Sequence, residues 1–123
     1  MKQLEYIPQT LNAIIYEIQK VEVLYQKAKD EYEILDENEK DFLATLKVEI
    51  SSREDVSNVE AETQARDSQE WKSFKSGKYQ AKRSLGEAQA RYKHLLRVME
   101  AVKIGISYNQ TLLKNNIHGE LGK

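Results

Sequence analysis

Residues 11–46 read LNAIIYEIQKVEVLYQKAKDEYEILDENEKDFLATL, and their apolar side chains return at alternating steps of three and four. Extended to residue 49, this spacing gives twelve positions, and only Glu39 and Glu49 among them are charged. The positions are Leu11, Ile14, Ile18, Val21, Tyr25, Ala28, Tyr32, Leu35, Glu39, Phe42, Leu46 and Glu49. A repeat this long predicts a coiled-coil helix, over residues 8–51, with Pro8 tolerated in its first turn. We expect both carboxylates to be buried at the seam and to specify helix alignment or partner choice.

A capping box follows residues 51–56, which are polar apart from Val56. In Ser57-Asn58-Val59-Glu60, we expect the serine hydroxyl to accept a hydrogen bond from the Glu60 amide, and the Glu60 carboxylate to accept one from the Ser57 backbone N–H. The sequence therefore predicts a turn at 52–57 and a second helix over 58–114. Gly77 leaves two alternatives open, a continuous helix or a kink near that residue. The polar composition of residues 115–123 predicts a flexible tail.

The second helix has an apolar seam of its own. It consists of Trp71, Phe74, Lys78, Ala81, Leu85, Ala88, Tyr92, Leu95, Met99, Val102, Ile106, Asn109 and Leu113. A short turn makes consecutive helices antiparallel, so we predict one all-α domain over 1–123, a long antiparallel coiled-coil hairpin. Folding about residue 55 places Leu35 near Lys75 and Ile18 near Tyr92.

In this hairpin the second helix extends past the first, and its end has no partner within the chain. The apolar side chains left there are Val102, Ile104, Ile106, Tyr108, Leu112 and Leu113. We predict that they form a partner or oligomer interface and that two hairpins pair as a homodimeric four-helix bundle.

Composition narrows the classes of function. The 123 residues include one proline, five glycines and no cysteine, which argues against a strand-rich fold and excludes thiolate chemistry. No apolar run reaches membrane-spanning length, and the first residues lack a secretory signal, so we expect a cytoplasmic protein that does not enter the membrane. Neither His94 nor His118 has a ligand or catalytic partner at a suitable spacing. We expect no enzyme activity, no metal and no cofactor.

Charge is divided along the chain. Residues 1–70 carry 8 Lys/Arg and 17 Asp/Glu, whereas residues 71–103 carry 9 Lys/Arg and 2 Asp/Glu. At 100° per residue, one arc of about 100° on the second helix collects Lys72, Lys75, Lys82, Arg83, Lys93 and Arg97. This arc is a candidate nucleic-acid interface, with Trp71 and Tyr79 nearby to stack on bases. The competing interpretation is that the basic helix pairs with the acidic helix, for example through Asp36 and Lys75.

Several segments carry a resemblance to a known group of proteins. They are Glu39 to Lys47, Ser57 to Glu62, Ala65 to Trp71, Ala88 to Tyr92, and Ser107. Over residues 30–110 the chain resembles small all-helical phage and prophage proteins that are usually encoded beside single-strand-annealing recombination genes. The resemblance implies an accessory role in the bacterial host cell, without catalytic residues.

Three functions follow as hypotheses. The first is an accessory protein for DNA recombination or replication that binds DNA, or a protein partner, through the basic arc. The second is a phage-encoded inhibitor of a host defence nuclease, like an anti-CRISPR protein, in which the acidic residues Glu31, Glu33, Asp36 and Glu37 imitate a phosphate backbone. The third is a structural coiled-coil adaptor.

Overall fold

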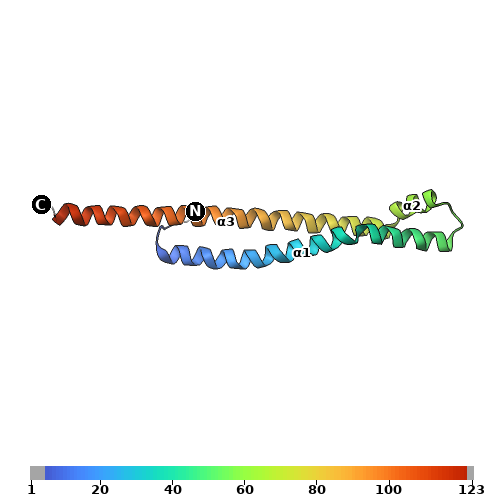
Figure 1. Ribbon diagram of the computed structural model, residues 1–123, viewed down its shortest axis with the longest axis horizontal. Helices are drawn as coiled ribbons and strands as arrows, with labels where there is room; N and C mark the ends of the chain where they lie inside the picture. The colour runs from blue at the N-terminus through green and yellow to red at the C-terminus, as the bar shows by residue number, and fades with distance from the viewer. Residues whose placement is uncertain (1–4, 122–123) are drawn as a thin grey trace. The chain divides into compact units, whose positions relative to one another are not determined.

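The computed structural model describes residues 5–121, with side chains for residues 5–115, and the chain is all-α (Figure 1). Its helices are α1 (Pro8–Arg53), α2 (Asn58–Asp67) and α3 (Gln69–Leu121). Residues 5–121 contain no strand, and none of their helices combines the length and apolar character needed to cross a bilayer.

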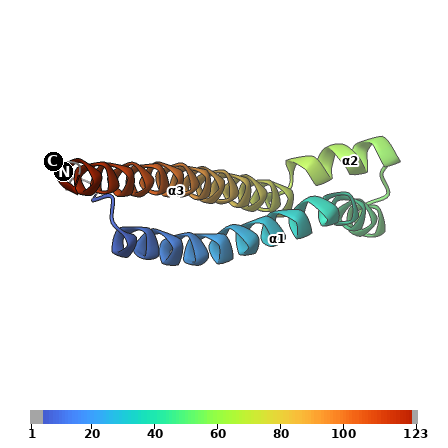
Figure 2. The same ribbon diagram turned by 60° about the vertical axis from the view of Figure 1, so that its left-hand side comes forward.

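Two serines define α2. The Glu60 amide donates to Ser57 Oγ at 3.2 Å, so α2 begins at the predicted cap. At the other end Ser68 is extended, with φ −68° and ψ 151°, and its hydroxyl donates to the Ala65 carbonyl at 2.6 Å while accepting from the Trp71 amide at 3.1 Å. Ser68 thus ends α2 and caps α3. Figure 2 shows α2 as a separate short helix that follows α1.

The second predicted helix therefore differs from the observed ones in two places. The interruption lies at Ser68, whereas α3 is helical through Gly77, where the sequence left a kink open. The predicted end at residue 114 is wrong, because the α3 backbone continues to Leu121. Residues 114–121 contain no proline, which would remove a helical hydrogen bond. Residues 122–123 of the predicted tail lie outside the described residues.

The chain divides into two compact units, unit 1 (Met1–Tyr25 and Ala88–Lys123) and unit 2 (Gln26–Glu87). In unit 1, Ile14 and Ile18 of α1 pack with Val102 of α3, while Tyr25 stacks on Tyr92 with ring centroids 5.8 Å apart. Residues later in α1 thus meet residues earlier in α3, which makes the two segments antiparallel. The single hairpin domain and its dimer remain predictions.

The core of unit 2 lies where all three helices meet. Leu46 and Ile50 of α1, Ala61 and Ala65 of α2, and Trp71 of α3 form one buried cluster. Ser68 makes this arrangement possible, because a break in the helix lets the segments before and after it both contact α1.

The apolar stripe of α1 is the one the heptad spacing predicts, apart from one position. Glu49, expected at the seam, is exposed, and Ile50 is buried in its place at 8% exposure. An apolar side chain gains more from burial than an unpaired carboxylate, so the helix turns Ile50 inward.

In unit 1 the stacked pair is shifted by about one heptad from the predicted alignment. Tyr92 packs against the cluster that contains Ile18, its expected neighbour, but its ring stacks on Tyr25, seven residues further along α1. The prediction treated 58–114 as one helix, and the non-helical residue Ser68 changes which residues face each other.

This alignment also corrects part of the predicted partner interface. Val102 is fully buried against Ile14 and Ile18, and Ile106 packs against the same cluster. These two residues have partners within the chain because α3 lies further along α1 than predicted. The other four remain exposed, at 68% for Ile104, 63% for Tyr108, 42% for Leu112 and 61% for Leu113, and their role as an interface stays a prediction.

Gly105 lies where Tyr6 contacts α3. A β-carbon added at Gly105 would overlap the Tyr6 ring, whereas one added at Gly86 would meet nothing within 4 Å. We expect Gly86→Ala to raise the free energy of unfolding by about 0.5–1 kcal/mol, because alanine favours the helix. Gly105→Ala should gain less, or lose stability, because Tyr6 must move. Urea denaturation followed by circular dichroism measures both, and equal gains would contradict the contact.

Candidate nucleic-acid interface

Four charged side chains connect α1 to α3 in unit 2. Lys75 Nζ donates to Glu39 Oε1 at 2.6 Å, and Lys78 Nζ donates to Glu39 Oε2 at 3.0 Å. Lys78 Nζ also lies 2.8 Å from Asp36 Oδ1, and its side chain is only 15% exposed. Glu39 of the first seam and Lys78 of the second, both half-buried, are therefore partners of each other.

These contacts change the protonation behaviour of the network. Hydrogen bonds from Lys75, and then from Lys78, hold the pKa of the Glu39 carboxyl below its usual value. Hydrogen bonds to Asp36 and Glu39 raise the pKa of the Lys78 ammonium well above its usual value. Both Glu39 and Lys78 are thus charged at neutral pH.

Acid should weaken this network. A carboxyl whose pKa is lower in the folded than in the unfolded protein stabilises the fold above the unfolded-state pKa, and that contribution is lost as the pH falls through the folded-state pKa. We expect the free energy of unfolding to fall as the pH drops below the usual glutamate value of 4.5, and Glu39→Gln to make that fall shallower. Urea midpoints measured across this pH range test the expectation.

Glu37→Gln is the matched control for this experiment. Glu37 is exposed and makes no ion pair within the described residues, so its variant should keep the wild-type dependence on pH. An equal change in both variants would show that the ion pairs of Glu39 do not stabilise the fold.

Two shallow depressions adjoin at Lys75. One, of about 260 Å³, is lined by Glu39, Lys40, Leu43, Arg66, Trp71 and Lys75. The other, of about 230 Å³, is lined by Tyr32, Lys75, Lys78, Tyr79 and Lys82. Lys72 precedes Lys75 by three positions and so lies beside it on the surface of α3. We call the surface formed by Lys40, Arg66, Lys72, Lys75, Lys78 and Lys82 the cationic face.

Each helix contributes to the cationic face. α1 supplies Lys40, α2 supplies Arg66, and α3 supplies the other four residues. Arg66 and Lys75 both lie over the ring of Trp71, with Cζ and Nζ at 5.8 and 5.7 Å from its centroid. The fold of unit 2 therefore gathers cations that lie far apart in the sequence.

The positive charge of this face is only partly neutralised. Lys75 and Lys78 pair with Glu39 and Asp36, and Arg66 pairs with Glu62 at 3.3 Å. Lys40, Lys72 and Lys82 are exposed and have no ion pair within the described residues. These three lysines can exchange water and counterions for an anionic ligand without breaking a bond in the protein.

The predicted basic residues belong to two different units. Lys72, Lys75, Lys82 and Arg83 lie in unit 2, and Arg83 forms a 3.3 Å pair with Glu87 on its own helix. Lys93 and Arg97 are exposed in unit 1. Ion pairs between the two helices, which the competing interpretation expected, do occur, but with other partners than the expected Asp36–Lys75 pair. Lys75 binds Glu39, and Asp36 binds Lys78, while Lys72 and Lys82 have no ion pair within the described residues.

The two aromatic residues expected beside the basic arc differ in exposure. Trp71 is 8% exposed and stacks on Phe42 and Phe74, so it is a core residue and is not accessible to bases. Tyr79 is 64% exposed and lines the cationic face. Of these two residues, therefore, only Tyr79 is exposed enough to stack on a base.

Sequence reasoning missed Lys40, Arg66 and Lys78 as members of this surface. Lys78 was assigned to the seam, and the helical position of a residue on α3 gives no information about residues on α1 and α2. The available signal for Lys78 was that the two seams carry complementary charges, a glutamate in one and a lysine in the other.

The four acidic residues of the alternative function differ in their ion pairs. Asp36 is bound to Lys78, whereas Glu31, Glu33 and Glu37 are exposed and form no ion pair within the described residues. Three of these four carboxylates thus remain available on α1.

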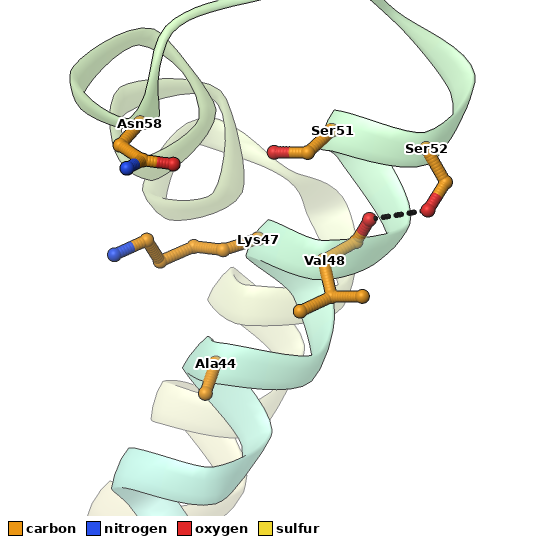
Figure 3. Close-up of a pocket in the computed structure, with 6 residues that line it drawn as sticks. All are labelled: Ala44, Lys47, Val48, Ser51, Ser52 and Asn58. Atoms are coloured by element: carbon orange, nitrogen blue, oxygen red, sulfur yellow. Dashed lines mark hydrogen bonds between the residues drawn. The ribbon is translucent and has the colours of Figure 1, made fainter.

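Another depression, of about 500 Å³, lies where α1 ends and α2 begins (Figure 3). Its lining is Ala44, Lys47, Val48, Ser51, Ser52 and Asn58. Lys47 is its single cation, and the Ser52 hydroxyl is already bound to the Val48 carbonyl at 2.8 Å. This depression offers an anion much less charge than the cationic face does.

The side chains of residues 5–115 bring together no group of three or more His, Asp or Glu that could hold a metal ion. No protein-family model, curated protein or solved structure matches the chain.

Proposed function

We propose that the chain is a non-enzymatic binding protein that holds the phosphate backbone of nucleic acid against the cationic face. The observation that supports this function is the pair of adjoining depressions, lined by five cations from three helices. Phosphate contacts supply most of the affinity of sequence-independent binding, and they need cations free to replace counterions. Lys40, Lys72 and Lys82 meet that need.

The composition of the face suggests which nucleic acid it binds. A shallow surface that combines lysines with one exposed aromatic residue suits a single strand, whose bases are free to stack. Tyr79 is the residue in position to stack. An accessory role in recombination or replication, where single strands are exposed, follows as the wider proposal.

Binding measured against salt concentration tests this function. Three phosphate contacts give a log–log slope of about −2 for a single strand, since each contact contributes about −0.7. Raising the salt from about 50 to 200 mM should then weaken binding about 20-fold. Fluorescence anisotropy with a labelled oligonucleotide measures the slope. A dissociation constant that does not change with salt concentration would contradict the proposal.

A second candidate function is charge mimicry directed at a basic protein. It is favoured by Glu31, Glu33 and Glu37, which are exposed and unpaired on α1 within the described residues. Reversing these three charges should abolish inhibition of a host defence nuclease and leave oligonucleotide binding intact. Loss of oligonucleotide binding in that variant would argue against two separate surfaces.

A further inference from the structure

A groove of about 490 Å³ runs along unit 2 between α1 and α3. Its lining is Glu31, Ile34, Leu35, Gly77, Gln80, Ala81 and Ser84. Ile34 is 56% exposed in it, a large apolar side chain that the chain itself leaves in water. The groove is therefore mostly apolar and unfilled.

The groove and the cationic face lie on different sides of α3. Gly77 and Ser84 are seven residues apart and share one side of the helix, and Lys75 and Lys82 share another in the same way. Each member of the first pair lies two positions after a member of the second, and a step of two positions corresponds to about 200° around the helix. An occupant of the groove would leave the cationic face accessible.

No close contact among the described residues explains a glycine at position 77. A β-carbon at this position would meet nothing within 4 Å, and the residue lies inside a regular helix, where glycine is less favourable than alanine. A glycine does let the backbone of a second helix approach closely.

The charge of the lining indicates what kind of molecule fits. Glu31 is its only charged residue. In a symmetric dimer the same patch meets itself, so a strongly charged patch would repel its copy, whereas a nearly neutral apolar one would not. The cationic face of the same unit carries six cations and does not meet this condition.

A second copy would also cover the exposed apolar side chain of the groove, because each chain brings its own Ile34 to the interface. We propose that the occupant of this groove is a second copy of the chain, with each groove packed against the other.

Sedimentation velocity of the full chain over a range of concentrations tests the proposal. The wild type should dimerise, and Gly77→Leu should raise the dimer dissociation constant at least about tenfold, because its side chain fills the groove. Gly86→Leu is the matched control, since Gly86 is also helical with nothing within 4 Å of an added β-carbon but lies outside the groove. It should dimerise as the wild type does.

A second pair of variants carries substitutions in α1. Ile34→Glu should weaken the dimer, and Val48→Glu, at a residue 65% exposed and outside the groove, should not. Circular dichroism checks that all four variants are folded. A monomeric wild type, or equal dissociation constants for the groove variants and their controls, would overturn the proposal. These outcomes are independent of the oligonucleotide measurement.

Discussion

Replacing Trp71 with alanine is expected to lower the free energy of unfolding by about 3–5 kcal/mol. The side chain is 8% exposed and stacks on Phe42 and Phe74, with ring centroids at 6.3 and 5.8 Å. It also belongs to the cluster that joins the three helices of unit 2. Its removal leaves a cavity and takes away two aromatic contacts, and the neighbouring residues can fill that space only in part.

Urea denaturation followed by circular dichroism measures this loss, with Tyr79→Ala as the control. Tyr79 is an aromatic residue of α3 that is 64% exposed, so its variant should stay within about 0.5 kcal/mol of the wild type. A loss of less than about 1 kcal/mol for Trp71→Ala would mean that the cluster does not hold the three helices together.

Reversing the charge of Lys40, Lys72 and Lys82 to glutamate is expected to weaken oligonucleotide binding at least about 100-fold at low salt. Each substitution removes a cation that is free to contact phosphate and adds an anion that repels it. All three residues are exposed and have no ion pair within the described residues, so folding should be retained. The slope of affinity against salt should approach zero.

The control changes the net charge by the same amount elsewhere. Lys27, Lys103 and Lys114 are exposed lysines outside the cationic face, and their reversal to glutamate should weaken binding several-fold through the general field alone. If both triple variants lose affinity equally, binding follows the net charge of the protein and has no defined surface.

The heptad pattern was sufficient to predict the helices and most of their buried faces. Along α1 every predicted seam position except Glu49 is buried or half-buried, because the 3.6-residue period of a helix determines which side chains share a face. The cap at Ser57 was also readable, since its hydroxyl acts on a neighbour only three residues away.

Alignment was not predictable in the same way. Ser68 has the same residue type as several serines that remain inside helices, such as Ser73 and Ser84, and only the packing of Ala65 and Trp71 on α1 selects it as the break. Every residue that follows then meets a different partner on α1. The cationic face depends on this alignment, so it could not be assembled from the position of each cation along its own helix.

The Glu39–Lys78 contact also distinguishes the native pairing from its nearest competitors during folding. Two apolar seams with the same period can slide past each other by one heptad and still bury apolar side chains. Slippage by one heptad in one direction would bring Lys78 beside Leu43 and Leu46, and in the other direction beside Lys29 and Tyr32. In the first case an ammonium is desolvated without a partner, and in the second it meets a like charge. The ion pairs thus act against kinetic traps, a contribution that an equilibrium measurement of their strength would not detect.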